Sequence, residues 1–97
     1  MLVRQLPRAI DTIEDGKQFV RSSGSVGANY IEANEALSKK DFLMRVKICR
    51  KEAKESKFWL ELMNVNGRGD LEKERKKLLK EAHELMLIFG SIIRKSE

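Results

Sequence analysis

The stretch RSSGSVGANYIEA, from Arg21 to Ala33, has residue types and spacings that could carry chemistry. Its Ser-Gly-Ser-Val-Gly segment is one residue short of the Gly-x-Ser-x-Gly nucleophile elbow, because Ser23 stands where the first glycine belongs. That elbow also needs a preceding strand, and a histidine and an acid to activate the serine. The chain has no convincing strand pattern and a single histidine, His83, so a serine hydrolase is not expected. The segment from Gly24 to Gly27 also matches the G-x-x-G loop of KH-type RNA clamps, but the surrounding strands of that module are missing.

The residues suited to metal, thiol or acid–base chemistry stand without the partners that such chemistry needs. His83 has no second histidine or cysteine at ligand spacing, and Cys49 sits within an apolar helical stripe, which is typical of a small buried hydrophobe. Glu32 and Glu35, close to Asn29, could form a polar site, although two carboxylates on a helix usually face solvent. We therefore predict no enzyme, no catalytic residue, no metal and no cofactor.

The basic excess of the chain belongs to one segment. Residues 39–63 carry eight basic and four acidic side chains, whereas residues 1–38 carry four and five. Like charges at four-residue spacing, such as Lys47 with Lys51, weaken a helix slightly, so helix stability alone does not explain them. One interpretation is a surface that neutralises nucleic-acid phosphates; the other is a solubilising face partly balanced by Glu52, Glu55 and Glu61. The candidate nucleic-acid-binding residues are Arg45, Lys47, Arg50, Lys51, Lys54 and Lys57.

The elements that would position these residues are helices. The chain of 97 residues is 36% charged and 41% hydrophobic with one proline, which predicts one all-α domain over residues 1–97. Ser38 and Asp41 form a capping box, and Asn64 to Gly69 reads as a short turn. We expect helices at about 9–36, 39–63 and 70–95, packed as an antiparallel up-and-down bundle. The predicted inward face of the middle helix is Phe42, Val46, Cys49, Ala53, Ser56, Leu60 and Met63.

The first expected helix contains two glycines on one of its faces. Each interior glycine costs a helix about 1 kcal/mol relative to alanine, so we predict that a neighbouring helix packs closely against Gly24 and Gly27. The residues at helical spacing on this face are Ile10, Ile13, Lys17, Val20, Gly24, Gly27 and Ile31.

Cysteine content and hydropathy bear on where the protein works. One cysteine excludes an internal disulfide framework and is consistent with a reducing compartment. The strongest apolar run, Leu85 to Ile93, is too short to span a bilayer, and no segment has the features of a secretion signal. We therefore expect a cytoplasmic protein that is not bound to a membrane.

The sequence resembles the four-helix-bundle family named for the 23S rRNA intervening-sequence protein, and more distantly the accessory variability proteins of diversity-generating retroelements. The resemblance rests first on the pattern Arg-Ser-x-x-Ser-x-x-Ala-Asn-x-x-Glu-Ala, which here is Arg21, Ser22, Ser25, Ala28, Asn29, Glu32 and Ala33. It continues through Ser38, Asp41 and Phe42, and then Lys51, Glu52, Ala53, Glu55, Ser56, Trp59 and Leu60. The residues to which we assign a structural role are Arg21, Ser22, Ser25, Gly27, Ala28, Asn29, Glu32 and Trp59.

The resemblance implies an antiparallel bundle that assembles as a homopentamer with a basic surface and has no catalytic activity. In the retroelement branch it also implies binding to a reverse transcriptase and to nucleic acid. Family members have a long first helix before a Leu-Pro element, whereas here only Met1 to Leu6 precede Pro7. We therefore expect a four-helix type of bundle with a truncated first helix, of which residues 1–6 are the remnant. The predicted function is an oligomeric accessory or adaptor protein that binds RNA or DNA, with a protein-only scaffold as the alternative.

Overall fold

The computed structural model describes the backbone of residues 10–63 and 69–97, and the side chains of residues 13–63 and 69–97. It consists of helices α2 (Ile10–Asn34), α3 (Lys39–Leu62) and α4 (Gly69–Ser96). Their ends lie within two residues of the ranges expected from the sequence. The expected remnant at residues 1–6 falls outside the described residues, as does most of the expected turn.

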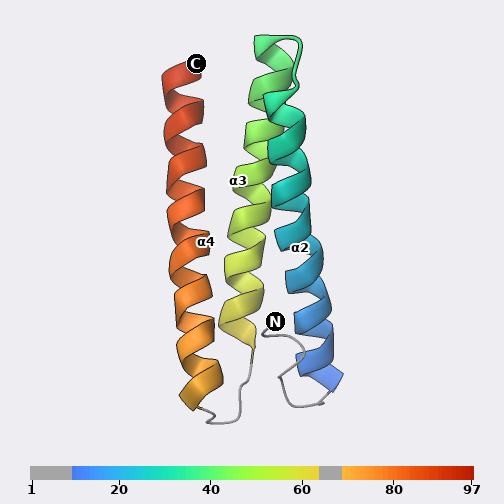
Figure 1. Cartoon of the computed structure of the whole chain (residues 1–97), viewed down its shortest axis with the longest axis vertical. Helices are drawn as coiled ribbons and strands as arrows, with labels where there is room; N and C mark the ends of the chain where they lie inside the picture. Colours follow the sequence, from blue (N-terminus) through green and yellow to red (C-terminus); the bar gives the residue numbers. More distant parts are fainter. Residues whose placement is uncertain (1–9, 64–68) are drawn as a thin grey trace.

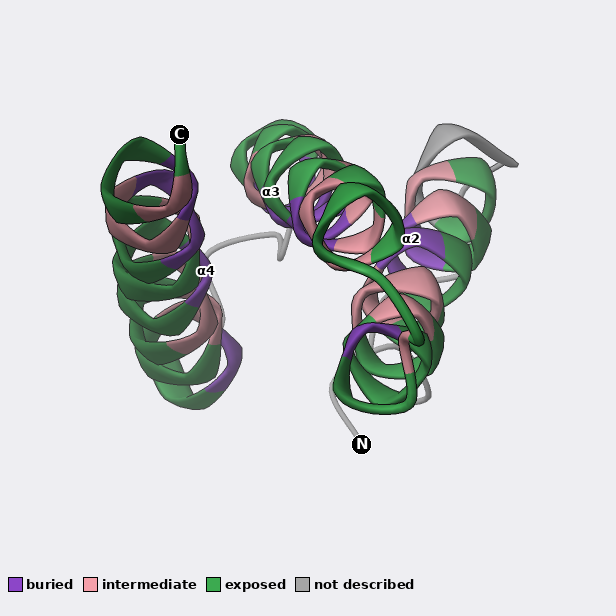
Figure 2. Cartoon of the chain, turned by 90° about the horizontal axis from the view of Figure 1, so that it is seen from above, coloured by how far each residue is buried: buried purple, intermediate pink, exposed green. Residues whose placement is uncertain are grey.

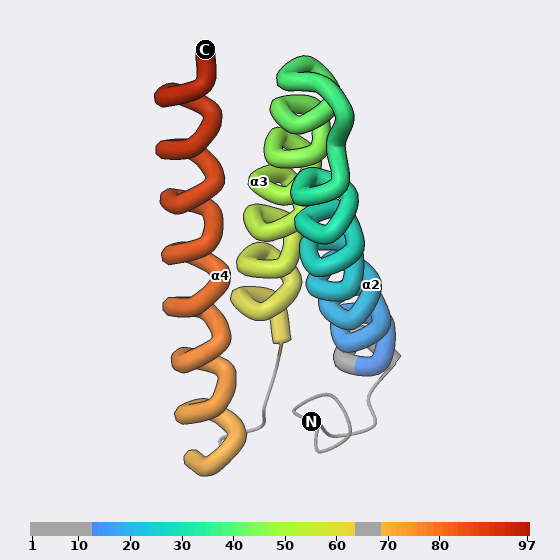
Figure 3. The backbone as a smooth tube through the Cα atoms, turned by 45° about the horizontal axis from the view of Figure 1, so that its top comes forward, coloured from blue at the N-terminus to red at the C-terminus, as the bar shows by residue number. Residues whose placement is uncertain are grey.

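The three helices pack antiparallel, and the all-α bundle predicted from the sequence is confirmed at this level (Figure 1). Helix α3 lies between the other two and packs against both along its length. Within the described residues, the backbones of α2 and α4 do not pack against each other. The molecule is an elongated body of 46 × 19 × 17 Å (Figure 3).

Local signals in the sequence account for the two ends of α3. The hydroxyl oxygen of Ser38 accepts a hydrogen bond from the backbone N–H of Asp41 at 3.1 Å, as the capping box predicts. At the other end, the N–H of Met63 donates to the carbonyl oxygen of Trp59. Helix α4 carries acidic residues in its first turn and Arg94 and Lys95 in its last turn, which complements the helix dipole.

The core lies along the faces that α2 and α4 turn toward α3 (Figure 2). The predicted inward face of α3 is confirmed, since six of its seven residues are buried and Phe42 is partly buried. One buried cluster, near the α3–α4 connection, consists of Phe19, Leu60, Met63, Leu71 and Ala82. The second, toward the other end, consists of Ala33, Val46, Cys49, Ala53, Phe89 and Ile93.

The prediction that a helix of this chain packs closely against Gly24 and Gly27 is wrong. Both glycines are exposed, and a Cβ atom added to either would have no neighbouring heavy atom of the described residues within 4 Å. Ile31, on the same face, is 64% exposed. Helix α2 instead turns Phe19, Ser22 and Ala33 inward. Two stripes of α2 have helical spacing, and periodicity alone does not show which of them meets α3.

Arg75 interrupts the apolar stripe of α4, and the structure explains why. Its Nη1 donates a hydrogen bond of 3.1 Å to the carbonyl oxygen of Leu60, in the last turn of α3. Carbonyl groups in the last turn of a helix have no partner within that helix, so the guanidinium supplies one from α4. Glu72 holds the same guanidinium through contacts of 2.9 Å to Nε and 2.6 Å to Nη2.

Candidate nucleic-acid interface

Five of the six predicted nucleic-acid-binding residues lie on adjoining faces of α3. Lys47, Arg50, Lys51 and Lys54 are exposed, and Lys57 is partly buried. A helix advances by 100° per residue, so these five positions fall within an arc of about 120°. We call this arc the basic face of α3, defined by Lys47, Arg50, Lys51, Lys54 and Lys57.

Arg45 lies apart from the basic face, although the sequence grouped it with the lysines. It is partly buried on the side of α3 that meets α2, and its Nη1 donates to Oδ1 of Asn29 at 3.0 Å. The sequence-based grouping relied on nearness along the chain. Arg45 is close to the lysines in sequence, but it lies on a different side of the helix.

Ion pairs within the chain leave much of the basic face uncompensated. Lys47 pairs with Glu97 at 3.3 Å, and Lys57 lies 4.0 Å from Glu61 and 3.3 Å from Nδ1 of His83. Among the described residues, no carboxylate lies within ion-pair distance of Arg50, Lys51 or Lys54.

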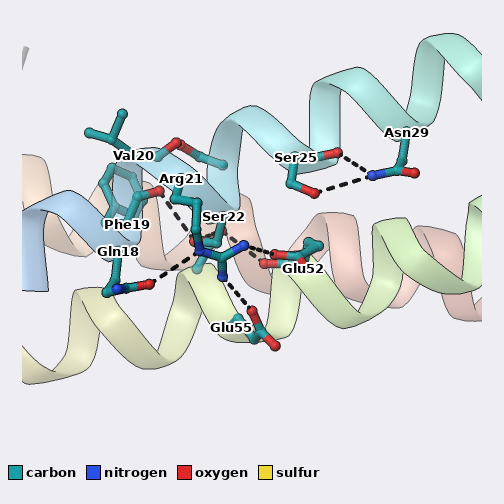
Figure 4. Close-up of polar contacts among 11 residues, drawn as sticks. Gln18, Phe19, Val20, Arg21, Ser22, Ser25, Asn29, Glu52 and Glu55 are labelled. Carbon is teal, nitrogen blue, oxygen red and sulfur yellow. Dashed lines mark hydrogen bonds and ion pairs between the residues drawn. The ribbon is translucent and has the colours of Figure 1, made fainter.

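The acidic residues proposed to balance the basic face mostly point elsewhere. Glu52 and Glu55 both contact Arg21 of α2 (Figure 4), at 3.4 Å and 2.8 Å respectively. Only Glu61 reaches a member of the basic face, at the outer limit of an ion pair. The interpretation of this face as a charge-balanced solubilising surface is therefore weakened.

A shallow hollow extends the basic face toward the start of α3. Its volume is about 700 Å³, and its floor is apolar while its rim is cationic. The lining residues are Lys39, Lys40, Leu43, Met44, Lys47, Ile48 and Lys51. This surface offers apolar contact and positive charge together.

The motif residues Arg21 and Ser22 fasten α2 to α3 (Figure 4). Arg21 donates to Gln18 on its own helix at 3.1 Å in addition to its two carboxylate contacts. The hydroxyl oxygens of Ser22 and Ser56 are 2.9 Å apart, and both residues are fully or almost fully buried. The side chain of Glu52 is 9% exposed, and its Oε2 accepts no hydrogen bond despite the nearby guanidinium. We call these contacts between Arg21, Ser22, Glu52, Glu55 and Ser56 the polar lock between α2 and α3.

The remaining motif residues divide between structural contacts and the surface. Asn29 donates to the carbonyl and hydroxyl oxygens of Ser25, at 2.9 and 3.2 Å, and accepts from Arg45. Ala28 and Glu32 are exposed, whereas Trp59 is partly buried against the core. The hollow beside Glu32 is lined by Glu32, Glu35, Ala36, Leu37, Asp41, Met44 and Arg45. Asn29 does not line it.

Cys49 and His83 differ in their exposure to solvent. Cys49 is fully buried, and burial raises the pKa of its thiol, which disfavours the reactive thiolate. His83 is exposed beside Lys57. Among the described residues, no three histidine, cysteine or acidic side chains are grouped as a metal site. None of the described helices is long and apolar enough to cross a membrane.

Sequence reasoning missed the exposure of Phe58 at the end of the basic face. Its side chain is 51% exposed, and its ring meets Trp59 edge to face with 5.0 Å between centroids. Its position, one turn after Lys54 and outside the apolar stripe, was the available signal.

The fold and this surface together define a class: an antiparallel helical bundle with a polar lock between α2 and α3 and a basic face on α3 that is only partly compensated. The profile of the family called 23S rRNA-intervening sequence protein matches residues 2–91. The chain belongs to this family. The predicted resemblance is thus confirmed for the family itself, and the relation to the retroelement proteins stays a prediction.

A solved structure supports the same assignment. It is a protein of unknown function from the S23 ribosomal protein family of Bacteroides thetaiotaomicron VPI-5482. The two chains are 34% identical with a TM-score of 0.72, over 81% of this chain and 72% of the other. The comparison with curated proteins gave no match.

Proposed function

We propose that this protein is a cytoplasmic, non-enzymatic accessory or adaptor factor that binds nucleic acid, RNA foremost, through the basic face of α3. The observation that carries the proposal is the set of three exposed cations, Arg50, Lys51 and Lys54, which have no acidic partner among the described residues. A cation that contacts a phosphate releases counterions condensed on the nucleic acid, which favours binding. Cations without internal partners gain most from this contact, because no ion pair has to be broken first.

The apolar groups beside these cations favour a single-stranded ligand. Phe58 offers an exposed ring one turn beyond Lys54, and stacking of bases on such rings tolerates any sequence. The hollow near Lys47 adds apolar surface at the other end of the basic face. A duplex would present mainly its phosphates to this surface and would gain little from the ring.

The test is binding of short RNA and DNA single strands and duplexes to the purified protein across a salt series. We expect log affinity to fall linearly with log salt with a slope of about 3 or more. The double variant K51E/K54E should lower affinity at least about tenfold, since each contact with a charged group is worth about 1.5–3 kcal/mol.

The matched control is K77E/K95E, which makes the same charge change at two exposed positions of α4. Equal losses for the two double variants would show that net charge, and not this face, drives binding. No binding at low salt would reject the proposal.

A second candidate function is a scaffold that binds only proteins. It is favoured by apolar surface on α2 and α4 that α3 does not cover. A groove of about 140 Å³ runs between α2 and α4 over α3. Its lining includes Phe19, Ser23, Val26, Leu78, Ala82 and Leu85. Next to it, α2 exposes Ile13, Val20 and Ile31 together with its two open glycines. Exposed apolar side chains that gather on one face often mark an interaction site.

We infer that this groove and the exposed face of α2 are covered in a homo-oligomer, which the family resemblance implies to be a pentamer. A helix of a second copy then takes the fourth position of a four-helix type of bundle. If the protein is a scaffold, a reverse transcriptase or another protein is the alternative partner that covers this groove.

Light scattering after gel filtration tests the assembly, with a mass of five 11.2 kDa chains expected. The variant Leu85→Lys places a charge in the groove and should release monomers. Leu87→Lys is the control, because Leu87 is 55% exposed and does not line the groove. A monomeric wild-type protein would refute the assembly.

A further inference from the structure

Two arginines from different helices converge over a glycine at the α3–α4 boundary. Gly90 of α4 is buried, and a Cβ atom added to it would lie 3.4 Å from Nη1 of Arg94 and 3.7 Å from Nε of Arg50. Among the described residues, and apart from the adjacent residues of α4 and its own backbone, no other heavy atom lies within 4 Å of that point. The missing side chain of Gly90 thus leaves a notch that the two guanidinium groups cover. We call it the Arg50–Arg94 notch.

The charges in the notch are not balanced from within the chain. Among the described residues, neither Arg50 nor Arg94 has a carboxylate within ion-pair distance. Glu97, three residues after Arg94, pairs with Lys47, and Glu52, two residues after Arg50, contacts Arg21. Two like charges directed at one point repel each other, so this arrangement favours an anion that bridges them.

The helix dipole explains only half of this arrangement. A cation in the last turn of α4 is favourable, which accounts for the position of Arg94. It does not account for Arg50, which comes from the middle of α3 and reaches the same point. Guanidinium groups present paired N–H donors that match the oxygen atoms of a phosphate, whereas a solubilising surface has no need of two arginines at one glycine.

We propose that the Arg50–Arg94 notch is a phosphate-binding site that holds one backbone phosphate of a bound nucleic acid. The inference rests on the proposed function for its ligand and extends the basic face of α3 onto α4. Arg50 and Arg94 donate to the non-bridging oxygens of the same phosphate, and Gly90 allows the close approach because it has no side chain. The notch fixes where the strand crosses the boundary between the two helices.

The first test measures the affinity of the full chain for inorganic pyrophosphate. NMR signals of the arginine Nε–H groups monitor the binding. We expect Arg50→Gln and Arg94→Gln each to lower pyrophosphate affinity about tenfold, as expected for the loss of a charge-assisted hydrogen bond. Lys95→Gln is the matched control, because it removes one exposed charge beside Arg94 without touching the notch.

A second test blocks the notch without changing charge. In Gly90→Leu, the Cβ atom of the new side chain meets guanidinium atoms of two flexible arginines, Arg94 and Arg50. We therefore expect the two guanidinium groups to move apart, and circular dichroism checks that the helices keep their packing. We expect a several-fold loss of pyrophosphate affinity. Gly24→Leu, at an exposed glycine with open space around it, should leave affinity unchanged.

The same variants are then measured with a single-stranded RNA of twelve nucleotides across a salt series. Arg50→Gln and Arg94→Gln should each reduce the salt slope by about 1, and Lys95→Gln should not. If all three variants behave alike toward pyrophosphate, the notch is not a phosphate site, even if RNA binding persists. If pyrophosphate binding depends on the notch but no RNA or DNA binds, the phosphate site stands and the proposed nucleic-acid function falls.

Discussion

The two interfaces of α3 are built from different chemistry. Toward α2, α3 presents polar groups: the buried Ser56 lies against Ser22, and the buried Glu52 and half-buried Glu55 contact Arg21. Toward α4, the buried contacts are apolar and include Leu71, Ala82, Phe89 and Ile93. The family motif therefore falls mainly on the polar interface.

The two kinds of contact have different roles in helix packing: one stabilises the pair and the other fixes its alignment. Apolar side chains supply most of the stabilising free energy but tolerate several alignments, because their contacts are non-directional. Hydrogen bonds and ion pairs add less net energy but are costly to leave unmade, so they fix one alignment. Helix α2, which has two stripes of helical spacing, needs this fixing more than α4 does.

The largest expected effect comes from the apolar interface. Leu71→Ala removes a side chain that is 1% exposed, and it should lower the free energy of unfolding by about 2–5 kcal/mol. Leu87→Ala, on the same helix but 55% exposed, should change it by less than about 0.5 kcal/mol. Urea denaturation followed by circular dichroism measures both. Equal losses would show that the core does not lie where the structure places it.

A smaller loss is expected at the polar interface. Arg21→Gln leaves the buried carboxylate of Glu52 without its cation, and should cost roughly 1–3 kcal/mol. Adding Glu52→Gln should restore part of the loss, with a coupling of about 0.5–3 kcal/mol in a double-mutant cycle. The control Lys17→Gln removes a cation whose pair with Glu14 is exposed, and should cost at most about 1 kcal/mol. Additive losses at Arg21 and Glu52 would contradict the polar lock.

Gly27→Ala tests the exposed face of α2. A Cβ atom at this position meets none of the residues that the structure describes. Alanine should therefore stabilise the isolated chain by up to about 1 kcal/mol through helix propensity. If a second copy packs on this face, the gain measured at low protein concentration should shrink or reverse at concentrations where the oligomer forms. A loss at every concentration would mean that a part of the same chain covers Gly27.

The smallest effect is expected in acid, at the start of α4. The hydrogen bonds from Arg75 hold the pKa of Glu72 below its ordinary value of 4.5. A lowered carboxyl pKa stabilises the folded state above pH 4.5, and this contribution is lost as the pH falls through the folded-state pKa. Glu72→Gln should therefore reduce the dependence of stability on pH below about 4.5. A pH series of thermal unfolding measures it, and an unchanged acid limb would contradict the pairing.

The sequence predicted the candidate site in part. The spacing of Lys47, Lys51 and Lys54 placed them on one outer face, and they are exposed. It grouped Arg45 with them because they are close in the chain, whereas the bond to Asn29 turns Arg45 toward α2. The Arg50–Arg94 notch joins positions 44 residues apart in sequence, on two helices, and no local pattern indicates that they meet.

The sequence by itself determined the helices, their ends and the inward face of α3, because capping residues and a single apolar stripe act within a few turns of one helix. Only the tertiary structure decided which stripe of α2 packs against α3. It also decided that Arg75 donates to the carbonyl oxygen of Leu60 and that Glu52 and Glu55 contact Arg21. Those outcomes depend on contacts between helices, where buried polar groups must find partners that lie far away in the chain. The basic face is therefore a property of the packed bundle, since the acids that neighbour it in sequence are held by α2.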